Sequence, residues 1–134
     1  MDHNWKERLV DLCRGMVRIP SLSGDEKRVA DYIELNMLNL GFDSVERDLY
    51  GNVSGRITLG SGGRRILFEG HMDHVDVSDP SKWEFDPYGA EVTDGKIYGR
   101  GTTDMKGNLA AAIMAAAAIK AEGRPLAGEI IVSG

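Results

Sequence analysis

Three side chains of this sequence, His71, Asp73 and Asp104, are of the types that hold or support a catalytic metal ion. A catalytic zinc is bound by imidazole nitrogen and carboxylate oxygen and keeps one coordination position open, which suits His71 and Asp104. Residues two apart in an extended segment project to the same side, so the carboxylate of Asp73 can orient the ring of His71. The carboxylate of Asp104 could hold two cations about 3.5–4 Å apart. Together these residues look like part of a two-metal hydrolase site.

Each of these residues also has an ordinary structural interpretation. A histidine at a strand end followed by acidic residues is usually a surface or hydrogen-bonded histidine, and Asp104 alone is typical of a helix N-cap. His74 lies one residue beyond Asp73, so an extended strand would turn it to the opposite side. We expect Lys106 to be solvated in a first helical turn. Arg100 could reach a substrate carboxylate or brace its own loop.

Apolar spacing predicts three helices around these residues. Residues 5–17 and 29–40 have apolar side chains at helical spacing, which predicts two amphipathic helices. The second follows Ser23-Gly24-Asp25-Glu26, which has the Ser-x-x-Glu form of a capping box, and it ends at Gly41. A third, alanine-rich helix is expected from Asp104 to Ala121, and its small side chains would let it pack closely on a sheet.

Strand patterns lie between these helices. Residues 42–49 and 53–59 predict two strands joined by a tight turn at Gly51 and Asn52, and Asp94-Gly95 predicts a second, shorter hairpin. Residues 65–69 predict a buried strand that delivers His71 at its carboxyl end, where open α/β sheets place their ligands. Another strand is expected at 129–133. The succession of strand, helix and strand predicts an α/β fold with a partly parallel sheet.

Composition narrows the class of protein. The 134 residues are 42% hydrophobic and 28% charged, which is typical of one globular domain, and the net charge is −5. The basic residues are not clustered, so we expect no nucleic-acid partner. No apolar run approaches the roughly 18 residues of a membrane span, and the first residues lack the apolar core of a signal peptide, so we expect a cytoplasmic protein without a membrane partner. The single Cys13 predicts a buried core thiol.

Taken together, the motifs closely resemble the metallopeptidase family of acetylornithine deacetylase, succinyl-diaminopimelate desuccinylase and carboxypeptidase G. The resemblance runs through the whole chain and is specific in the order and spacing of its motifs. The segments that carry it are Ile19–Glu26, Gly41-Phe42, Gly51-Asn52, Gly70–Asp73, Trp83–Tyr88, Asp94–Gly101 and Asp104–Gly107.

The resemblance implies a fold and a site. It implies a three-layer, zinc-exopeptidase-like α/β catalytic domain with a mixed sheet, of which residues 1–134 would be the truncated N-terminal portion. His71 would bind one Zn²⁺, Asp104 would bridge two, and Asp73 would act in catalysis by orienting His71; Co²⁺ or Mn²⁺ could replace zinc. The general-base glutamate, the remaining metal ligands and the dimerisation domain of the family are absent from this sequence, and the complete protein would be a homodimer.

The activity that the resemblance implies is hydrolysis of an amide bond by a water molecule held between two zinc ions. The substrate would be an N-acyl amino acid, a dipeptide or a related small carboxylate. Because two ligands cannot complete two zinc sites, we expect the 134-residue chain alone to be inactive, and the alternative is a non-catalytic domain with weak or no metal binding. A dinucleotide-binding domain is less favoured, because Gly99-x-Gly101-x-x-Asp104 places an acidic residue where that fingerprint needs a third glycine.

Overall fold

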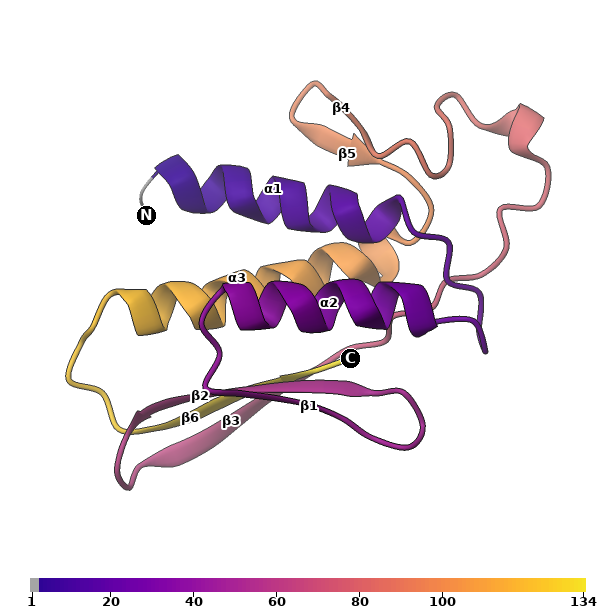
Figure 1. The fold of residues 1–134 in the computed structure, drawn as a ribbon. Coiled ribbons are helices and arrows are strands. Elements are labelled where there is room, and N and C mark those ends of the chain that lie inside the picture. Colours follow the sequence, from indigo (N-terminus) through magenta and orange to yellow (C-terminus); the bar gives the residue numbers. More distant parts are fainter. Residues whose placement is uncertain (1–2) are drawn as a thin grey trace.

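Four strands form one mixed sheet in the computed structural model, which describes residues 3–134 (Figure 1). The strands are β1 (Ser44–Arg47), β2 (Val53–Gly60), β3 (Arg64–Glu69) and β6 (Gly128–Ser133). They follow the order β1-β2-β6-β3, in which β3 and β6 run parallel and the other neighbours run antiparallel. The predicted α/β class and the partly parallel sheet are therefore confirmed.

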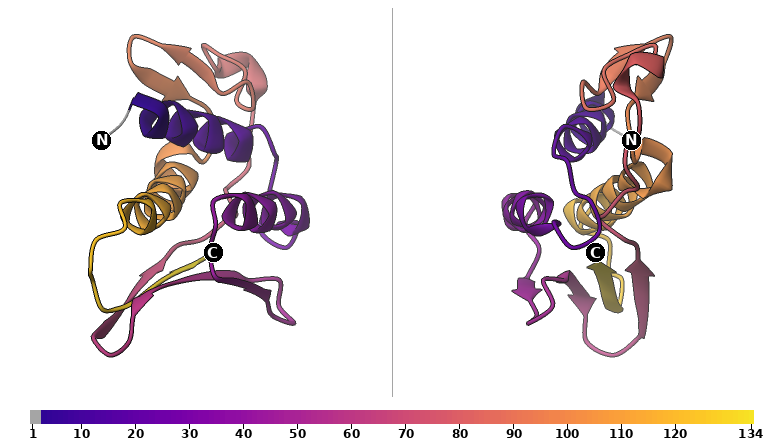
Figure 2. Two further views of the ribbon diagram at one scale, coloured as in Figure 1. Left: turned by 60° about the vertical axis from the view of Figure 1, so that its left-hand side comes forward. Right: turned by 90° about the vertical axis from the view of Figure 1, so that its right-hand side faces the viewer.

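Three helices lie on the same side of this sheet (Figures 1 and 2). They are α1 (His3–Val17), α2 (Lys27–Asn39) and α3 (Gly107–Ala121). The sheet is contacted by α2 and α3, while α1 packs on both of these helices from the side away from the sheet. A two-stranded hairpin, β4 (Glu91–Thr93) and β5 (Lys96–Tyr98), lies beyond α1, and two short helical turns span Pro80–Lys82 and Thr102–Lys106.

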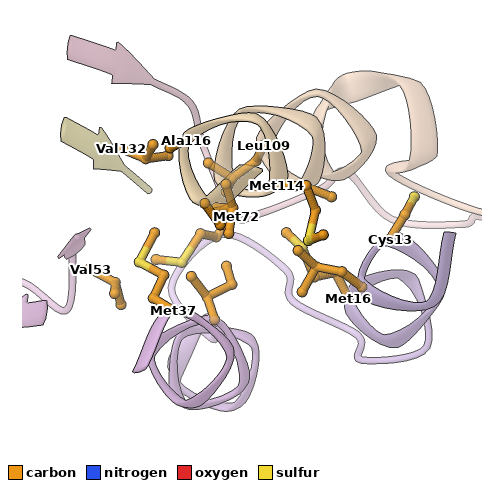
Figure 3. Packing of buried hydrophobic residues seen from close by; sticks show 14 of the residues in the cluster. Cys13, Met16, Met37, Val53, Met72, Leu109, Met114, Ala116 and Val132 are labelled. Carbon is orange, nitrogen blue, oxygen red and sulfur yellow. The ribbon is translucent and has the colours of Figure 1, made fainter. Parts of the chain in front are cut away.

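The hydrophobic core fills the space between the sheet and the helices (Figure 3). Burial of each large aliphatic side chain there stabilises the fold by about 1.5–3 kcal/mol. At Gly55 on β2, an added Cβ would lie 2.6 Å from both the Met37 sulfur and a ring carbon of Phe42, so only glycine allows α2 to approach this closely. The fully buried aliphatic residues and methionines include Met16, Val29, Ile33, Met37, Val53, Ile57, Ile113 and Val132.

The alanine-rich helix α3 is enclosed on two sides, by the sheet and by α1. Ala110, Ala116 and Ala117 are buried together with Leu109 and Ile113. A helix that is apolar around its circumference is typical of such a position, and small side chains keep the distance to both neighbours short. The sequence prediction of a thin helix packed on a sheet is correct.

The prediction that residues 65–69 form a buried strand is wrong, because β3 is an exposed edge of the sheet. All six of its residues are exposed, including Ile66, Leu67 and Phe68. The strand after α3 enters the sheet between β2 and β3, so β6 takes the central position and the helices pack over β6 and β2. The apolar run of β3 therefore belongs to a strand that few of the described residues cover.

The hairpin predicted at Asp94-Gly95 is present, and both residues have the positive φ angles, 51° and 74°, of a type I′ turn. Its second strand, β5, pairs with β4 alone within residues 3–134 and does not belong to the main sheet. A dinucleotide fingerprint needs a parallel-sheet strand before its glycine-rich turn, so the structure contradicts that alternative. Across the described part of the chain, no helix is both long enough and apolar enough to cross a membrane.

Candidate metal centre

His71 lies just past the carboxyl end of β3, as the sequence predicted. The peptide N–H of Gly70 donates to the Ser133 carbonyl at 3.0 Å, which continues the sheet pairing up to the residue before His71. The ring of His71 then has a carboxylate at each nitrogen. Its Nδ1 lies 2.9 Å from Oδ1 of Asp73, and its Nε2 lies 2.9 Å from Oδ1 of Asp104. The structure thus brings the three predicted residues together.

These contacts affect the pKa of His71. Partial burial disfavours the charged imidazolium, but the carboxylates of Asp104 and Asp73 outweigh that effect, so the pKa of His71 is raised. The side chain of Asp104 is 87% exposed, so its carboxylate has room for further partners. The site thus places two carboxylates around one imidazole.

Asp104 belongs to a tight turn and not to the helix that was predicted to begin at this residue. Its φ and ψ angles of −124° and 90° are non-helical, and α3 begins only at Gly107. The turn starts at Gly101, whose φ of 77° favours glycine, and the N–H of Lys106 closes it by donating to the Gly101 carbonyl at 2.9 Å. This geometry projects the Asp104 carboxylate out of the helix start and toward His71.

Lys106 is fully buried, which contradicts the prediction of a solvated side chain. Its ammonium group donates to the carbonyl of Met16 in the last turn of α1 at 3.0 Å and to that of Ile19 just after this helix at 2.7 Å. Burial lowers the pKa of Lys106 to about 8, and the nearby carboxylate of Asp73 partly opposes this shift. Lys106 therefore ties the turn that carries Asp104 to the end of α1.

The capping box predicted at Ser23 and Glu26 is also wrong. Helix α2 begins at Lys27 without a side-chain cap, and the Glu26 carboxylate instead accepts a hydrogen bond from the N–H of Gly24 at 2.7 Å. The hydroxyl of Ser23 donates to Oδ2 of Asp73. This hydrogen bond is the largest cause of the lowered pKa of Asp73, and His71 contributes in the same direction. No local pattern could reveal a contact across fifty positions of sequence.

The segment before Ser23 pairs with the segment that carries the candidate ligands. Leu22 and His74 form an isolated parallel bridge, and the N–H of His74 donates to the Ser21 carbonyl at 2.9 Å. The Ser21 hydroxyl donates to the Met72 carbonyl at 2.7 Å, and the Ser21 N–H donates to Nε2 of His74 at 2.9 Å. The ring of His74 is buried in these contacts, in agreement with its predicted orientation away from the ring of His71.

A cavity of about 260 Å³ adjoins the three candidate residues and is lined also by the segment Gly99–Thr103. Arg100 lines it, and its guanidinium carbon lies 4.8 Å from the centre of the Trp83 ring. Stacking on Trp83 supports the bracing role that the sequence left open for Arg100. A wider groove of about 920 Å³ lies on the other side of His71, against the turn between β1 and β2, and Gly134 lines it as well.

The donor set fits a part of a metal site. His71 and Asp104 supply an imidazole nitrogen and a carboxylate oxygen, and Asp73 supplies the carboxylate that commonly supports a metal-bound histidine. Within residues 3–134 there is no group of three or more histidine, cysteine, aspartate or glutamate side chains arranged to hold a metal ion.

Comparison with known proteins places this arrangement in a family. Residues 67–134, about half of the chain, match the model of peptidase family M20/M25/M40. The chain therefore belongs to this family of peptidases.

Two curated relatives are similar over most of this chain. YgeY, an uncharacterised protein of Escherichia coli K12, is 43% identical over 117 residues, and succinyl-diaminopimelate desuccinylase of Methylocella silvestris is 38% identical over 129 residues. The alignments cover 87% and 90% of this chain but only 28% and 32% of the relatives. The chain thus spans less than a third of the length of the curated relatives that it matches.

Solved structures share the fold at low sequence identity. The di-peptidase Dug1p of Saccharomyces cerevisiae superposes with a TM-score of 0.84 at 20% identity, over 97% of this chain and 32% of that one. Bacillus subtilis YXEP, described as a dinuclear metal-binding peptidase of the M20 family, superposes with a TM-score of 0.69 at 18% identity, over 99% of this chain and 35% of that one. The family therefore includes peptidases that bind two metal ions.

Proposed function

We propose that this chain forms the N-terminal portion of the catalytic domain of a metal-dependent hydrolase that cleaves an amide bond. The observation that carries the proposal is the imidazole of His71 between two carboxylates, Asp73 at 2.9 Å and Asp104 at 2.9 Å, in a chain of the M20 family. This group lies at the carboxyl end of a strand, which is where open α/β sheets bind their ligands.

In this proposal His71 would hold one metal ion, and the exposed carboxylate of Asp104 would be shared between two. Asp73 accepts a hydrogen bond from Nδ1–H, which leaves the lone pair of Nε2 for the metal. We take the ions to be Zn²⁺, for which imidazole and carboxylate are suitable ligands, with Co²⁺ or Mn²⁺ as substitutes. Bound at these residues, such ions would supply a water nucleophile at neutral pH and a Lewis acid for the amide carbonyl.

The other groups that the reaction needs lie outside residues 1–134 in this proposal. They are the general-base glutamate, the remaining ligands and a dimerisation domain, all of which the family resemblance implies. The Gly134 backbone exchanges hydrogen bonds with Val53 at 2.8 and 2.9 Å and lines the groove beside His71. A residue that followed Gly134 would therefore enter the protein close to the candidate site.

The substrate class that we propose is an N-acyl amino acid, a dipeptide or a related small carboxylate. This class is supported by two similar proteins, one of which is named a succinyl-diaminopimelate desuccinylase and the other a di-peptidase. We also propose that the complete protein is a homodimer. A cytoplasmic location stays a prediction from the sequence.

A panel of amide substrates tests this function. The protein expressed from its complete reading frame is incubated with Zn²⁺, Co²⁺ or Mn²⁺ and with N-succinyl and N-acetyl amino acids and dipeptides. We expect metal-dependent release of a free amine, a loss of at least about a thousandfold in His71→Ala, and little change in Asp76→Asn, an exposed residue that does not line the cavity. Turnover that survives both a chelator and His71→Ala would contradict the proposal.

A further inference from the structure

We propose that Ser23 is a positioning residue of the metal site, which fixes the carboxylate of Asp73 against His71. This inference rests on the proposed function, since it assigns a role in metal binding. It starts from the hydroxyl of Ser23, which contacts Asp73 instead of capping α2.

The contacts form a chain from Ser23 to Asp104. The Ser23 hydroxyl donates to Oδ2 of Asp73, and Oδ1 of the same carboxylate lies 2.9 Å from Nδ1 of His71. Nε2 of His71 in turn lies 2.9 Å from Asp104. Oδ2 and Oδ1 of Asp73 thus contact Ser23 and His71, respectively, and these two contacts together orient the carboxylate. Without the hydroxyl, Asp73 could rotate and lose its alignment with Nδ1 of His71.

Backbone hydrogen bonds on both sides of Ser23 hold it beside Asp73. Leu22 forms a parallel bridge with His74, and Ser21 contributes three hydrogen bonds to Met72 and His74 on the same segment. On its other side, the N–H of Asp25 donates to the Leu22 carbonyl at 2.8 Å and closes a turn around Ser23. The residues just before Ser23 are therefore bonded to the segment that carries His71 and Asp73.

Stability does not explain this contact. Ser23 is exposed, so removal of its oxygen opens no cavity in the core, and surface substitutions of this kind usually change the free energy of unfolding little. The effect of the hydroxyl should instead appear in metal binding. Loss of a direct partner of a metal-bound histidine typically costs about 10–100-fold in metal affinity. Because Ser23 acts one contact further away, we expect a smaller loss of about three- to tenfold.

The test measures Zn²⁺ affinity by competition with a chromophoric chelator, together with the thermal unfolding midpoint, in the protein expressed from its complete reading frame. Ser23→Ala should weaken Zn²⁺ binding about three- to tenfold without a change in the midpoint, and Ser23→Thr, which keeps the hydroxyl, should restore affinity. Ser61→Ala, at an exposed serine in the turn between β2 and β3, is the matched control and should change neither quantity.

A double-mutant cycle then asks whether Ser23 acts through Asp73. Ser23→Ala should have no further effect on Zn²⁺ affinity in an Asp73→Asn background. Full Zn²⁺ affinity in Ser23→Ala, additive losses in the double variant, or a loss that tracks the unfolding midpoint and is not rescued by threonine would overturn the inference. His71→Ala separates the proposed metal site from the role of Ser23. If His71→Ala binds Zn²⁺ like the unaltered protein, the proposed metal site is wrong. If His71→Ala loses affinity while Ser23→Ala keeps it, only the role of Ser23 is wrong.

Discussion

At the scale of single residues, His71 is the centre of the candidate site because its two ring nitrogens meet two different carboxylates. Nδ1 lies 2.9 Å from Oδ1 and 3.1 Å from the backbone carbonyl of Asp73, and Nε2 lies 2.9 Å from Oδ1 of Asp104. In our proposal Asp73 would keep the proton on Nδ1 when Nε2 binds a metal ion. The orientation of one ring thus depends on a residue two positions away in the chain and on another in a distant turn.

The role of Asp73 can be tested by replacing one carboxylate oxygen with an amide nitrogen. We expect Asp73→Asn to weaken Zn²⁺ binding about 10–100-fold, since the amide is a poorer acceptor for the imidazole N–H and can present an amino group to it. Equilibrium dialysis of Zn²⁺ against the protein from the complete reading frame measures this. Asp76→Asn, three residues further along and exposed, is the control and should bind Zn²⁺ normally. Equal affinities in all three proteins would argue against an orienting role.

Lys106 gives a prediction about stability. In Lys106→Ala the carbonyls of Met16 and Ile19 lose their buried charged donor, so we expect a loss of about 2–4 kcal/mol in the free energy of unfolding. The matched control is Lys120→Ala, which also removes an ammonium group from a carbonyl, that of Gly41, but at the surface. There we expect about 1 kcal/mol or less. Urea unfolding measures both, and similar losses would contradict the internal role of Lys106.

At the scale of elements, the two parallel strands β3 and β6 differ in their surroundings although both are apolar. Ile66 on β3 and Ile130 on β6 are register partners, yet their exposed fractions are 52% and 5%. Both face the helices, but α3 packs over β6 and leaves the edge strand open. The contribution of an apolar strand residue is therefore set by the helix above it.

This difference predicts unequal costs of truncation in the 134-residue chain. Ile130→Ala should lower the free energy of unfolding by about 2–4 kcal/mol, because it leaves a cavity under α3. Ile66→Ala should cost about 1 kcal/mol or less, since half of that side chain is already in water. Chemical unfolding of the two variants at low protein concentration tests this. Equal costs would mean that β3 is covered in solution.

A surface ion pair joins the end of α3 to the sheet and predicts a pH dependence. Lys120 Nζ lies 2.5 Å from Oδ1 of Asp43, whose Oδ2 accepts from the N–H of Thr58 at 2.8 Å. Lys120, and secondarily the Thr58 N–H, lower the pKa of Asp43. Because the folded-state pKa lies below the unfolded-state value, the stabilisation is complete above about pH 4 and is lost as the pH falls through the folded-state pKa.

The measurement compares the unaltered chain with Asp43→Asn, which keeps an oxygen acceptor and removes the charge. We expect the unaltered chain to be more stable by about 0.5–1 kcal/mol near pH 6, as is usual for a surface pair. The difference should shrink near pH 3, as protonation of Asp43 removes the same charge. A difference that stays constant over this range would assign the stabilisation to hydrogen bonding and not to charge.

At the scale of the whole molecule, the described residues supply some of the ligands of a dinuclear site and none of its general base in our proposal. Residues 3–134 contain no group of three or more histidine, cysteine, aspartate or glutamate side chains arranged to hold a metal ion. We therefore expect the purified 134-residue chain to show no Zn²⁺-dependent cleavage of an N-acetyl or N-succinyl amino acid, and to bind Zn²⁺ much more weakly than the protein from the complete reading frame. Measurable turnover by the purified chain would prove this expectation wrong.

The sequence by itself determined the elements and the candidate ligands. Periodic apolar residues predicted the helices, the Asp94-Gly95 turn predicted a hairpin, and the spacing of His71 and Asp73 predicted their contact, since all of these depend on residues close in the chain. The family was also predicted from the motifs and is confirmed.

Only the tertiary structure decided which residues had the contacts and the burial that their local patterns predicted. Ser23 bonds to Asp73 and does not cap α2. Lys106 is buried against the end of α1. Strand β3 is an exposed edge because β6 lies between it and β2. In each case the partner is distant in sequence, and the choice depends on which polar group or apolar face the complete fold brings near. The alternation and spacing of residues fix local geometry, whereas the partner of a side chain is settled only when the elements pack.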